Sequence, residues 1–164
     1  MNIKINPLLQ AHWLSVSQIY WEGIQTGNAT FEQQVPSWEK WHGCHLNTCR
    51  FVVEHENKVI GWAALSPISE RCVYAGVCEV SVYVASSYQG RGIGCHLLNN
   101  LIEGSEKENI WTLQAGIFPE NIASVTLHKN CGFREVGMRE KIGRMNGKWR
   151  DVLLLEHRSK IIGI

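Results

Sequence analysis

Three glycines at alternate positions mark the stretch of this chain best suited to bind an anionic ligand. The residues Gln89-Gly90-Arg91-Gly92-Ile93-Gly94 stand between a β-branched apolar run and a stretch with apolar residues at helical spacing, which predicts a strand, a loop and a helix. Because glycine has no Cβ atom, the loop can turn its amide N–H groups toward a ligand. The helix start adds unpaired N–H groups and the positive end of the helix dipole, and Arg91 adds a full charge. We therefore expect a diphosphate to bind here; the alternative is an ordinary turn from strand to helix.

The residue sequence of this loop excludes two common nucleotide-binding motifs. It is not a Walker loop, because no Gly-Lys-Ser/Thr follows, and Cys95 stands where the Gly-x-Gly-x-x-Gly fingerprint has its third glycine. The loop instead resembles the acetyl-CoA loop, Gln/Arg-x-x-Gly-x-Gly/Ala, of the GCN5-related N-acetyltransferases. Residues 121–133 resemble the other signature of that family, which has an Asn, a Ser, an aromatic residue or His, and a final Gly-Phe. With both signatures in the family's order and separation, the chain is identified as a member of this superfamily.

The resemblance implies the family's α/β (α+β) fold, with a mixed sheet of about seven strands, two splayed central parallel strands and about four helices. The patterns of apolar and turn-forming residues predict the same kind of domain over residues 1–164. The predicted strands are 3–5, 50–54, 58–65, 78–84, 111–118, 132–136 and 149–156, and the predicted helices are 9–26, 37–45, 92–108 and 121–130, with a turn-rich segment at 143–148.

Acetyl-CoA is the co-substrate that the resemblance implies. Its diphosphate would bind to the glycine loop, and its pantetheine arm would meet the backbone edge exposed between the splayed strands, 80–84 and 112–118. A backbone N–H aimed at the thioester carbonyl would stabilise the tetrahedral oxyanion. The expected cofactor contacts are Val82, Tyr83, Val84, Gln89, Gly90, Arg91, Gly92, Ile93, Gly94, Cys95, Asn121 and Ser124.

Glu79 and His128 are the candidate catalytic residues. An amine must be neutral to attack a thioester, yet alkyl amines are mostly protonated at pH 7, so a general base is useful. Glu79 is the only acid in the apolar run 77–84; the alternative is a solvated glutamate at the start of a strand. His128 stands where the superfamily usually has a tyrosine that protonates the departing thiolate. It could serve as that acid or as part of a base relay.

A closer resemblance is to the phosphinothricin acetyltransferase group. It is carried by Thr-Phe-Glu at 30–32, Glu-x-Ser-Val-Tyr-Val at 79–84, Leu-His at 127–128 and Gly-x-Trp-x-Asp-Val at 147–152. This implies a small amino-acid-like substrate, such as phosphinothricin, methionine sulfone or methionine sulfoximine, that is acetylated on its α-amine. The resemblance also implies a homodimer, for which the 149–156 strand and the 143–148 turn are candidate contacts.

Four residues are candidates for binding the acceptor substrate. In the superfamily, the segment between the first two helices commonly walls the acceptor pocket, which assigns Phe31 and Glu32 to that wall. The guanidinium of Arg71 could donate two parallel hydrogen bonds to the two oxygens of a carboxylate, phosphinate or sulfone group. Tyr74 could donate another hydrogen bond. The alternatives are a core plug for Phe31 and a solvated loop charge for Arg71.

Composition narrows the possible partners. A net charge of +1 does not favour a nucleic acid or an anionic membrane, and no apolar run suits a membrane span or a signal peptide. We therefore expect a cytoplasmic protein. The six cysteines form no Cys-x-x-Cys pair and are not spaced with His as zinc ligands, so we expect reduced thiols and no metal. Two rival functions stay open, namely a relative that acetylates a protein N-terminus, a polyamine or an antibiotic, and a non-catalytic acyl-CoA-binding sensor.

Overall fold

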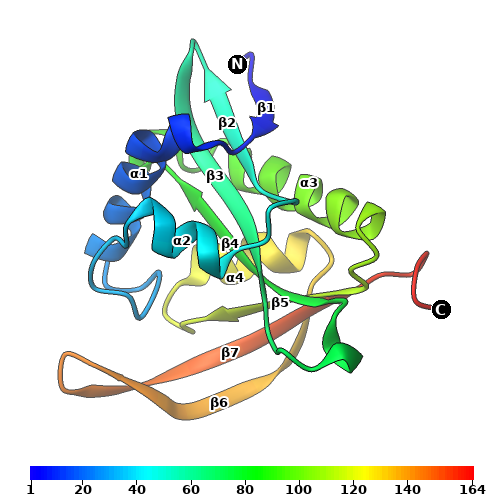
Figure 1. The fold of residues 1–164 in the computed structure, drawn as a ribbon. Helices are drawn as coiled ribbons and strands as arrows, with labels where there is room; N and C mark the ends of the chain where they lie inside the picture. Colours follow the sequence, from blue (N-terminus) through cyan, green and yellow to red (C-terminus); the bar gives the residue numbers. More distant parts are fainter.

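Seven strands form one mixed sheet in the order β1-β2-β3-β4-β5-β7-β6 (Figure 1). The computed structural model describes residues 1–164. The strands are β1 (Lys4–Pro7), β2 (Phe51–His55), β3 (Lys58–Pro67), β4 (Val77–Val84), β5 (Thr112–Ile117), β6 (Arg134–Met145) and β7 (Lys148–Arg158), and the helices are α1 (Trp13–Gln25), α2 (Trp38–Cys44), α3 (Ile93–Lys107) and α4 (Ile122–Asn130). The predicted order of strands and helices is confirmed, as is the mixed α/β sheet.

The splay of the two central parallel strands is present. β4 and β5 pair at only three positions, Val77 with Thr112, Cys78 with Leu113 and Glu79 with Gln114. Beyond Glu79, β4 continues to pair with β3 on its other side, as far as Val84. The edge of β4 that faces β5 therefore has free backbone groups over 80–84, where a ligand can pair with them.

The sheet is packed on both faces. The apolar stripe of α3, which contains Leu97, Leu98 and Leu101, joins one core with β-strand residues such as Val80. On the opposite face, α1 and α2 enclose a second core that includes Trp41 and Trp62. Alternation along β4 follows from these two layers, because Val80 faces the α3 core whereas Tyr83 packs against the α1–α2 core.

The last hairpin differs from the prediction. The sequence predicts a strand at 132–136 and a turn-rich segment at 143–148, but β6 runs to Met145 and forms a long hairpin with β7 (Figure 1). The turn is confined to Asn146 and Gly147, with φ values of 50° and 76°, the left-handed pair that a tight hairpin requires. Many residues of β6 are charged or are glycine, and these residue types have a weak intrinsic preference for strands. Their extended conformation therefore depends on hydrogen bonding to β7.

The structure holds no helix long and apolar enough to span a membrane.

Candidate active site

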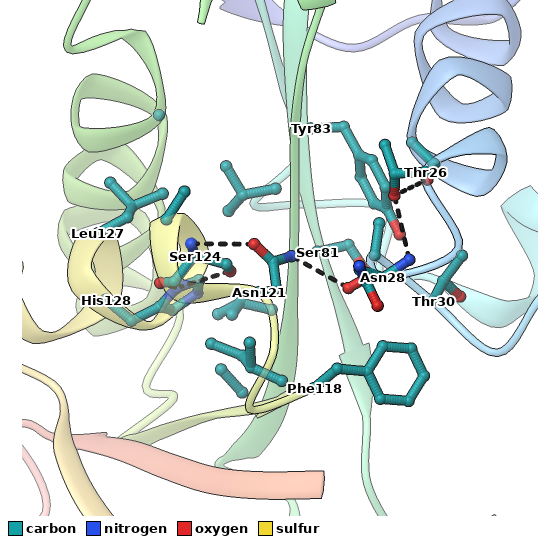
Figure 2. A pocket seen from close by; sticks show the side chains of 18 of the residues that line it. Thr26, Asn28, Thr30, Ser81, Tyr83, Phe118, Asn121, Ser124, Leu127 and His128 are labelled. Atoms are coloured by element: carbon teal, nitrogen blue, oxygen red, sulfur yellow. Dashed lines mark hydrogen bonds between the residues drawn. The ribbon is translucent and has the colours of Figure 1, made fainter. Parts of the chain in front are cut away.

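A cavity of about 1210 Å³ opens where β4 and β5 separate. Its wall combines the splayed strands, the glycine loop, the start of α4, the α1–α2 loop (residues 26–37) and part of β6. Figure 2 shows Ser124 and His128 on one side of this cleft, Asn28 and Thr30 on the other. Segments far apart in the sequence therefore share one site.

The three glycines of the loop have two roles, one shared by Gly90 and Gly92 and the other belonging to Gly94. Gly90 and Gly92 have φ values of 73° and 79°, in the left-handed region that favours glycine. A Cβ atom at either position would meet nothing within 4 Å, so the backbone is open to a ligand. A Cβ on Gly94 would lie 2.9 Å from the Leu127 side chain. Gly94 therefore lets α3 and α4 pack closely.

The predicted cofactor residues mostly line the cleft. From the loop and the first turn of α3 these are Gln89, Gly90, Gly92, Ile93, Gly94 and Cys95, and from β4 they are Val82, Tyr83 and Val84. Arg91 is not among the lining residues, and its guanidinium instead lies 5.2 Å from the centre of the Tyr88 ring. A direct role of Arg91 in cofactor binding stays a prediction.

Asn121 spans the cleft between α4 and the α1–α2 loop. Its Oδ1 accepts a hydrogen bond from the Ser124 backbone N–H at 3.2 Å, which caps α4. Its Nδ2 donates to the Asn28 carbonyl at 3.1 Å (Figure 2). Both predicted cofactor residues, Asn121 and Ser124, lie in the wall of the cleft. The side chain of Asn121 also ties together two segments that no local sequence pattern connects.

His128 is buried and held in one orientation. Its Nδ1 lies 2.8 Å from the Ser124 carbonyl oxygen; because a carbonyl can only accept, Nδ1 carries the proton and Nε2 is left as an acceptor. Burial lowers the pKa of His128, since desolvation disfavours the charged imidazolium. The ring also packs edge-on against Phe133. A neutral imidazole with a free Nε2 can accept a proton, and must do so before it can act as an acid.

Glu79 occupies the last paired position before β4 and β5 separate. It is exposed on the wall of the cleft, and Gln114 of β5 donates a hydrogen bond from Nε2 to Glu79 Oε2 at 3.3 Å. The carboxylate is thus held at the point of the splay while remaining accessible. Both candidate catalytic residues, Glu79 and His128, line the same cleft.

Of the predicted acceptor residues, the structure brings only two into this cleft. Phe31 and Glu32 line it, and the Phe31 ring meets Phe118 edge-on with 4.8 Å between ring centres. Arg71 and Tyr74 lie on the exposed connection between β3 and β4, where the Arg71 guanidinium is 5.5 Å from the centre of the Tyr74 ring. They do not line the cleft, so their role in acceptor binding stays a prediction.

Sequence reasoning missed Arg139 of β6. It is the one lysine or arginine among the residues that line the cleft, and none of the ion pairs in the structure involves it. β6 bulges beside it, since Gly143 pairs with Arg150 although Arg139 pairs with Val152. The bulge is held by a 2.7 Å hydrogen bond from the Lys141 N–H to Asp151 Oδ1. No sequence signal indicates which way a residue beside a bulge points.

Arg150 of β7 is a second residue that the sequence did not reveal. Its guanidinium donates to the Gly27 carbonyl at 3.0 Å and to Asn28 Oδ1 at 2.9 Å, and it stacks 3.9 Å from the centre of the Phe118 ring. It also pairs with Glu120 at 3.4 Å. The only feature of the sequence that could have pointed to Arg150 is its position between Trp149 and Asp151 in the Gly-x-Trp-x-Asp-Val segment.

The comparison with known protein families agrees with this geometry. The model of the acetyltransferase (GNAT) family matches residues 13–133, which is most of the chain and includes both the glycine loop and α4. The chain belongs to the GNAT family. Its splayed strands, glycine loop and α4 cap are therefore features of a GNAT fold.

Individual GNAT relatives are similar at modest identity. A phosphinothricin N-acetyltransferase of Streptomyces coelicolor is 38% identical over 99 residues, which are 60% of this chain and 58% of that relative. One from Alcaligenes faecalis is 30% identical over 148 residues, 87% of this chain and 75% of the relative. The crystal structure of a ribosomal-protein-alanine N-acetyltransferase from Brucella melitensis superposes with a TM-score of 0.86 at 30% identity, covering 95% of this chain and 99% of that one.

Proposed function

We propose that this GNAT protein transfers the acetyl group of acetyl-CoA to the α-amine of a small amino acid that carries an anionic group. The observation that carries the proposal is that Arg139 is the one lysine or arginine in a cleft wall that also contains Glu79, Glu32 and the Arg150-paired Glu120. An amino acid carries a positive ammonium group and a negative carboxylate, which are complementary in charge to Glu79 and Arg139. The names of the Streptomyces and Alcaligenes relatives support this choice of acceptor.

The transfer itself needs little from the protein beyond positioning and a base. Glu79 takes a proton from the ammonium group of the acceptor, directly or through one water, and the neutral amine attacks the thioester carbon. The C–N bond forms as the carbonyl oxygen becomes negative, and a free N–H on the open edge of β4 is suited to stabilise it. The C–S bond then breaks, CoA leaves as a thiolate, and the acceptor nitrogen loses its second proton. His128 is neutral at pH 7, so its Nε2 can take this proton and pass it to the thiolate; it is not a preformed acid.

Arg139 is the residue that we assign to the acceptor's anionic group. A guanidinium can bind a carboxylate or phosphinate with two parallel hydrogen bonds. Arg139 has no competing ion pair in the protein, whereas Arg150, the neighbouring arginine across the hairpin, is already bonded to the α1–α2 loop. Arg71 does not line the cleft, which makes it the matched comparison for any test of Arg139.

The test is the release of CoA thiol with a panel of acceptors. The panel contains phosphinothricin, methionine sulfone, methionine sulfoximine, spermidine, an aminoglycoside and a short peptide that begins with alanine. We expect turnover with the first three only, and turnover of cationic amines alone would refute the anionic acceptor. We expect Arg139→Gln to raise KM for the amino acid about ten-fold without changing KM for acetyl-CoA, and Arg71→Gln to have less effect. The reverse order would return the anion site to Arg71.

A protein N-terminus is the second candidate acceptor. It is favoured by the similarity to the Brucella ribosomal-protein-alanine N-acetyltransferase, which extends over 95% of this chain. The alanine peptide in the panel separates the two candidates directly. A protein that binds acetyl-CoA but acetylates none of the amines would instead be a sensor.

We also propose that the protein is a cytoplasmic homodimer formed through the β6–β7 hairpin. The hairpin exposes Trp149, with 59% of its surface accessible, together with Val136, Met138 and Ile142. Large apolar side chains exposed on one hairpin are unusual for a monomer and are common in subunit interfaces. Sedimentation should give a dimer for the wild type and a monomer for Trp149→Glu; a monomeric wild type would refute this interface.

A further inference from the structure

Two thiols lie almost in bonding distance behind the cofactor loop. Cys95 is in the first turn of α3 and Cys131 directly follows α4, and their Sγ atoms are 3.2 Å apart. A disulfide requires about 2.05 Å between the sulfur atoms, so an approach of about 1 Å would allow the bond to form. We refer to Cys95 and Cys131 as the thiol pair.

The members of the thiol pair have different surroundings. Cys95 is partly exposed and lines the cleft, so a small oxidant can reach it from there. Asn99 Nδ2 lies 3.5 Å from Cys95 Sγ, where it can donate to a sulfur that gains negative charge. Cys131 is only 9% exposed, and its burial, followed by the neighbouring Cys95 thiol, raises its pKa to about 12. Cys95 is thus the thiol open to attack, and Cys131 is the resolving partner.

We propose that the thiol pair is a site of reversible oxidation, at which a peroxide converts Cys95 and Cys131 to an intramolecular disulfide and weakens the binding of acetyl-CoA. The peroxide transfers one oxygen atom to Cys95 and leaves as water or an alcohol, forming a sulfenic acid. Cys131 Sγ then attacks the Cys95 sulfur, the S–S bond forms, and the hydroxyl group leaves as water with the Cys131 proton. A thiol such as glutathione restores the pair by exchange.

The position of the thiol pair explains why oxidation would affect the cofactor. α3 and α4 meet at two successive α3 residues, Gly94 against Leu127 and Cys95 against Cys131. The glycine loop feeds directly into this turn of α3, with Gly92 as its N-cap. Drawing Cys95 toward Cys131 would shift the first turn of α3 and the amide groups that face the diphosphate. The loop would then be held away from its binding geometry.

Thermodynamic linkage makes the coupling measurable in both directions. If the disulfide form binds the cofactor about ten-fold more weakly, saturating cofactor must favour the reduced thiols by the same factor. A ten-fold change for this two-electron couple corresponds to a rise in reduction potential of about 30 mV. This part of the inference rests on the proposed binding of acetyl-CoA, whereas disulfide formation itself does not.

The disulfide is tested by peptide mapping after treatment with hydrogen peroxide. Trypsin cleaves after Arg91, Lys107, Lys129 and Arg134, so the disulfide would link peptide 92–107 to peptide 130–134. We expect this linked peptide in the wild type and in Cys72→Ser, which removes an exposed cysteine, and its release by dithiothreitol. Oxidation of Cys95 to sulfinic acid without a linked peptide, or linkage of other cysteines, would overturn the proposal.

The coupling is tested by calorimetry with a CoA thioether, which has no free thiol to reduce the disulfide. We expect the oxidised wild type to bind this probe about ten-fold more weakly than the reduced protein. Cys131→Ser, whose changed residue does not line the cleft, cannot form the disulfide and should lose less affinity on peroxide treatment than the wild type. Equal affinity of the oxidised and reduced wild type would overturn the coupling. Failure of the reduced protein to bind the probe would refute both the coupling and the proposed function, while the linked peptide still decides the disulfide.

Discussion

Phe31 of the α1–α2 loop packs so closely on Gly143 of β6 that a Cβ atom on the glycine would lie 2.5 Å from the ring. The other side of the contact is Phe118, which meets the Phe31 ring edge-on. This part of the cleft wall is therefore assembled from three separate segments, and it depends on the absence of a side chain at residue 143.

Gly143→Ala should displace Phe31 and damage acceptor binding. The ring is 37% exposed, so it can swing toward solvent and relieve the clash without unfolding the protein. We expect kcat/KM for the acceptor to fall about ten-fold, equivalent to about 1.4 kcal/mol, with KM for acetyl-CoA unchanged. Gly137→Ala, on the same strand but with open space around the new Cβ, is the matched control. Equal effects of the two changes would show that Phe31 does not shape the acceptor site.

Arg150→Leu should loosen the α1–α2 loop. The guanidinium makes hydrogen bonds to Gly27 and Asn28, and bonds to charged groups contribute about 1.5–3 kcal/mol each. We expect a rise in acceptor KM of about ten-fold or more and faster amide exchange in the loop. Arg150→Lys should have an effect between those of the wild type and Arg150→Leu, because an ammonium group cannot donate the two parallel hydrogen bonds of a guanidinium.

The control for Arg150 is Arg144→Ala, which removes an exposed arginine of the same hairpin that lies over the Trp149 ring. It should leave both KM values unchanged. If Arg150→Leu impaired acetyl-CoA and acceptor alike, the arginine would be supporting the whole cleft and not the loop.

Glu79→Gln should lower kcat near neutral pH by about 10²-fold or more, as the loss of a general base does. Its amide keeps the shape of the side chain and can still bond with Gln114. Binding of acetyl-CoA should therefore be retained. Glu103→Gln, on the exposed side of α3, serves as the control. An unchanged pH–rate profile in Glu79→Gln would remove Glu79 from this role.

His128 should make the protein less stable in mild acid. Burial holds the pKa of the folded-state imidazole below its usual value of about 6.5. Below pH 6.5 the unfolded chain therefore binds more protons at this residue, and the free energy of unfolding falls as the pH drops until the folded-state pKa is reached. His128→Gln should flatten this decline, by up to about 1.4 kcal/mol per pH unit, between pH 7.5 and 5.5.

Urea midpoints at the two pH values measure this effect. Burial likewise lowers the pKa of His45 and His157, so a residual pH dependence should persist in His128→Gln. A slope in His128→Gln equal to that of the wild type would show that His128 titrates normally in the folded protein.

Local patterns were enough to predict the glycine loop and the helices α3 and α4 beside it. The glycine loop and the apolar stripe of α3 are each encoded within about fifteen residues, where backbone preference and spacing act directly. The hydrogen bond by which Asn121 caps α4 was not predicted. β6 was predicted too short because its residues favour a strand only when β7 supplies hydrogen bonds.

The sequence by itself determined the family, the order of strands and helices, and the two carriers of chemistry, Glu79 and His128, as candidates. Only the tertiary structure decided which charges face the cleft. It placed Arg139 in the wall of the cleft, left Arg71 on an outer connection, bonded Arg150 to Asn28 and set Cys95 against Cys131. The direction of a side chain beside a bulge or a loop, and its partners from distant segments, arise from packing between elements, which local spacing does not encode.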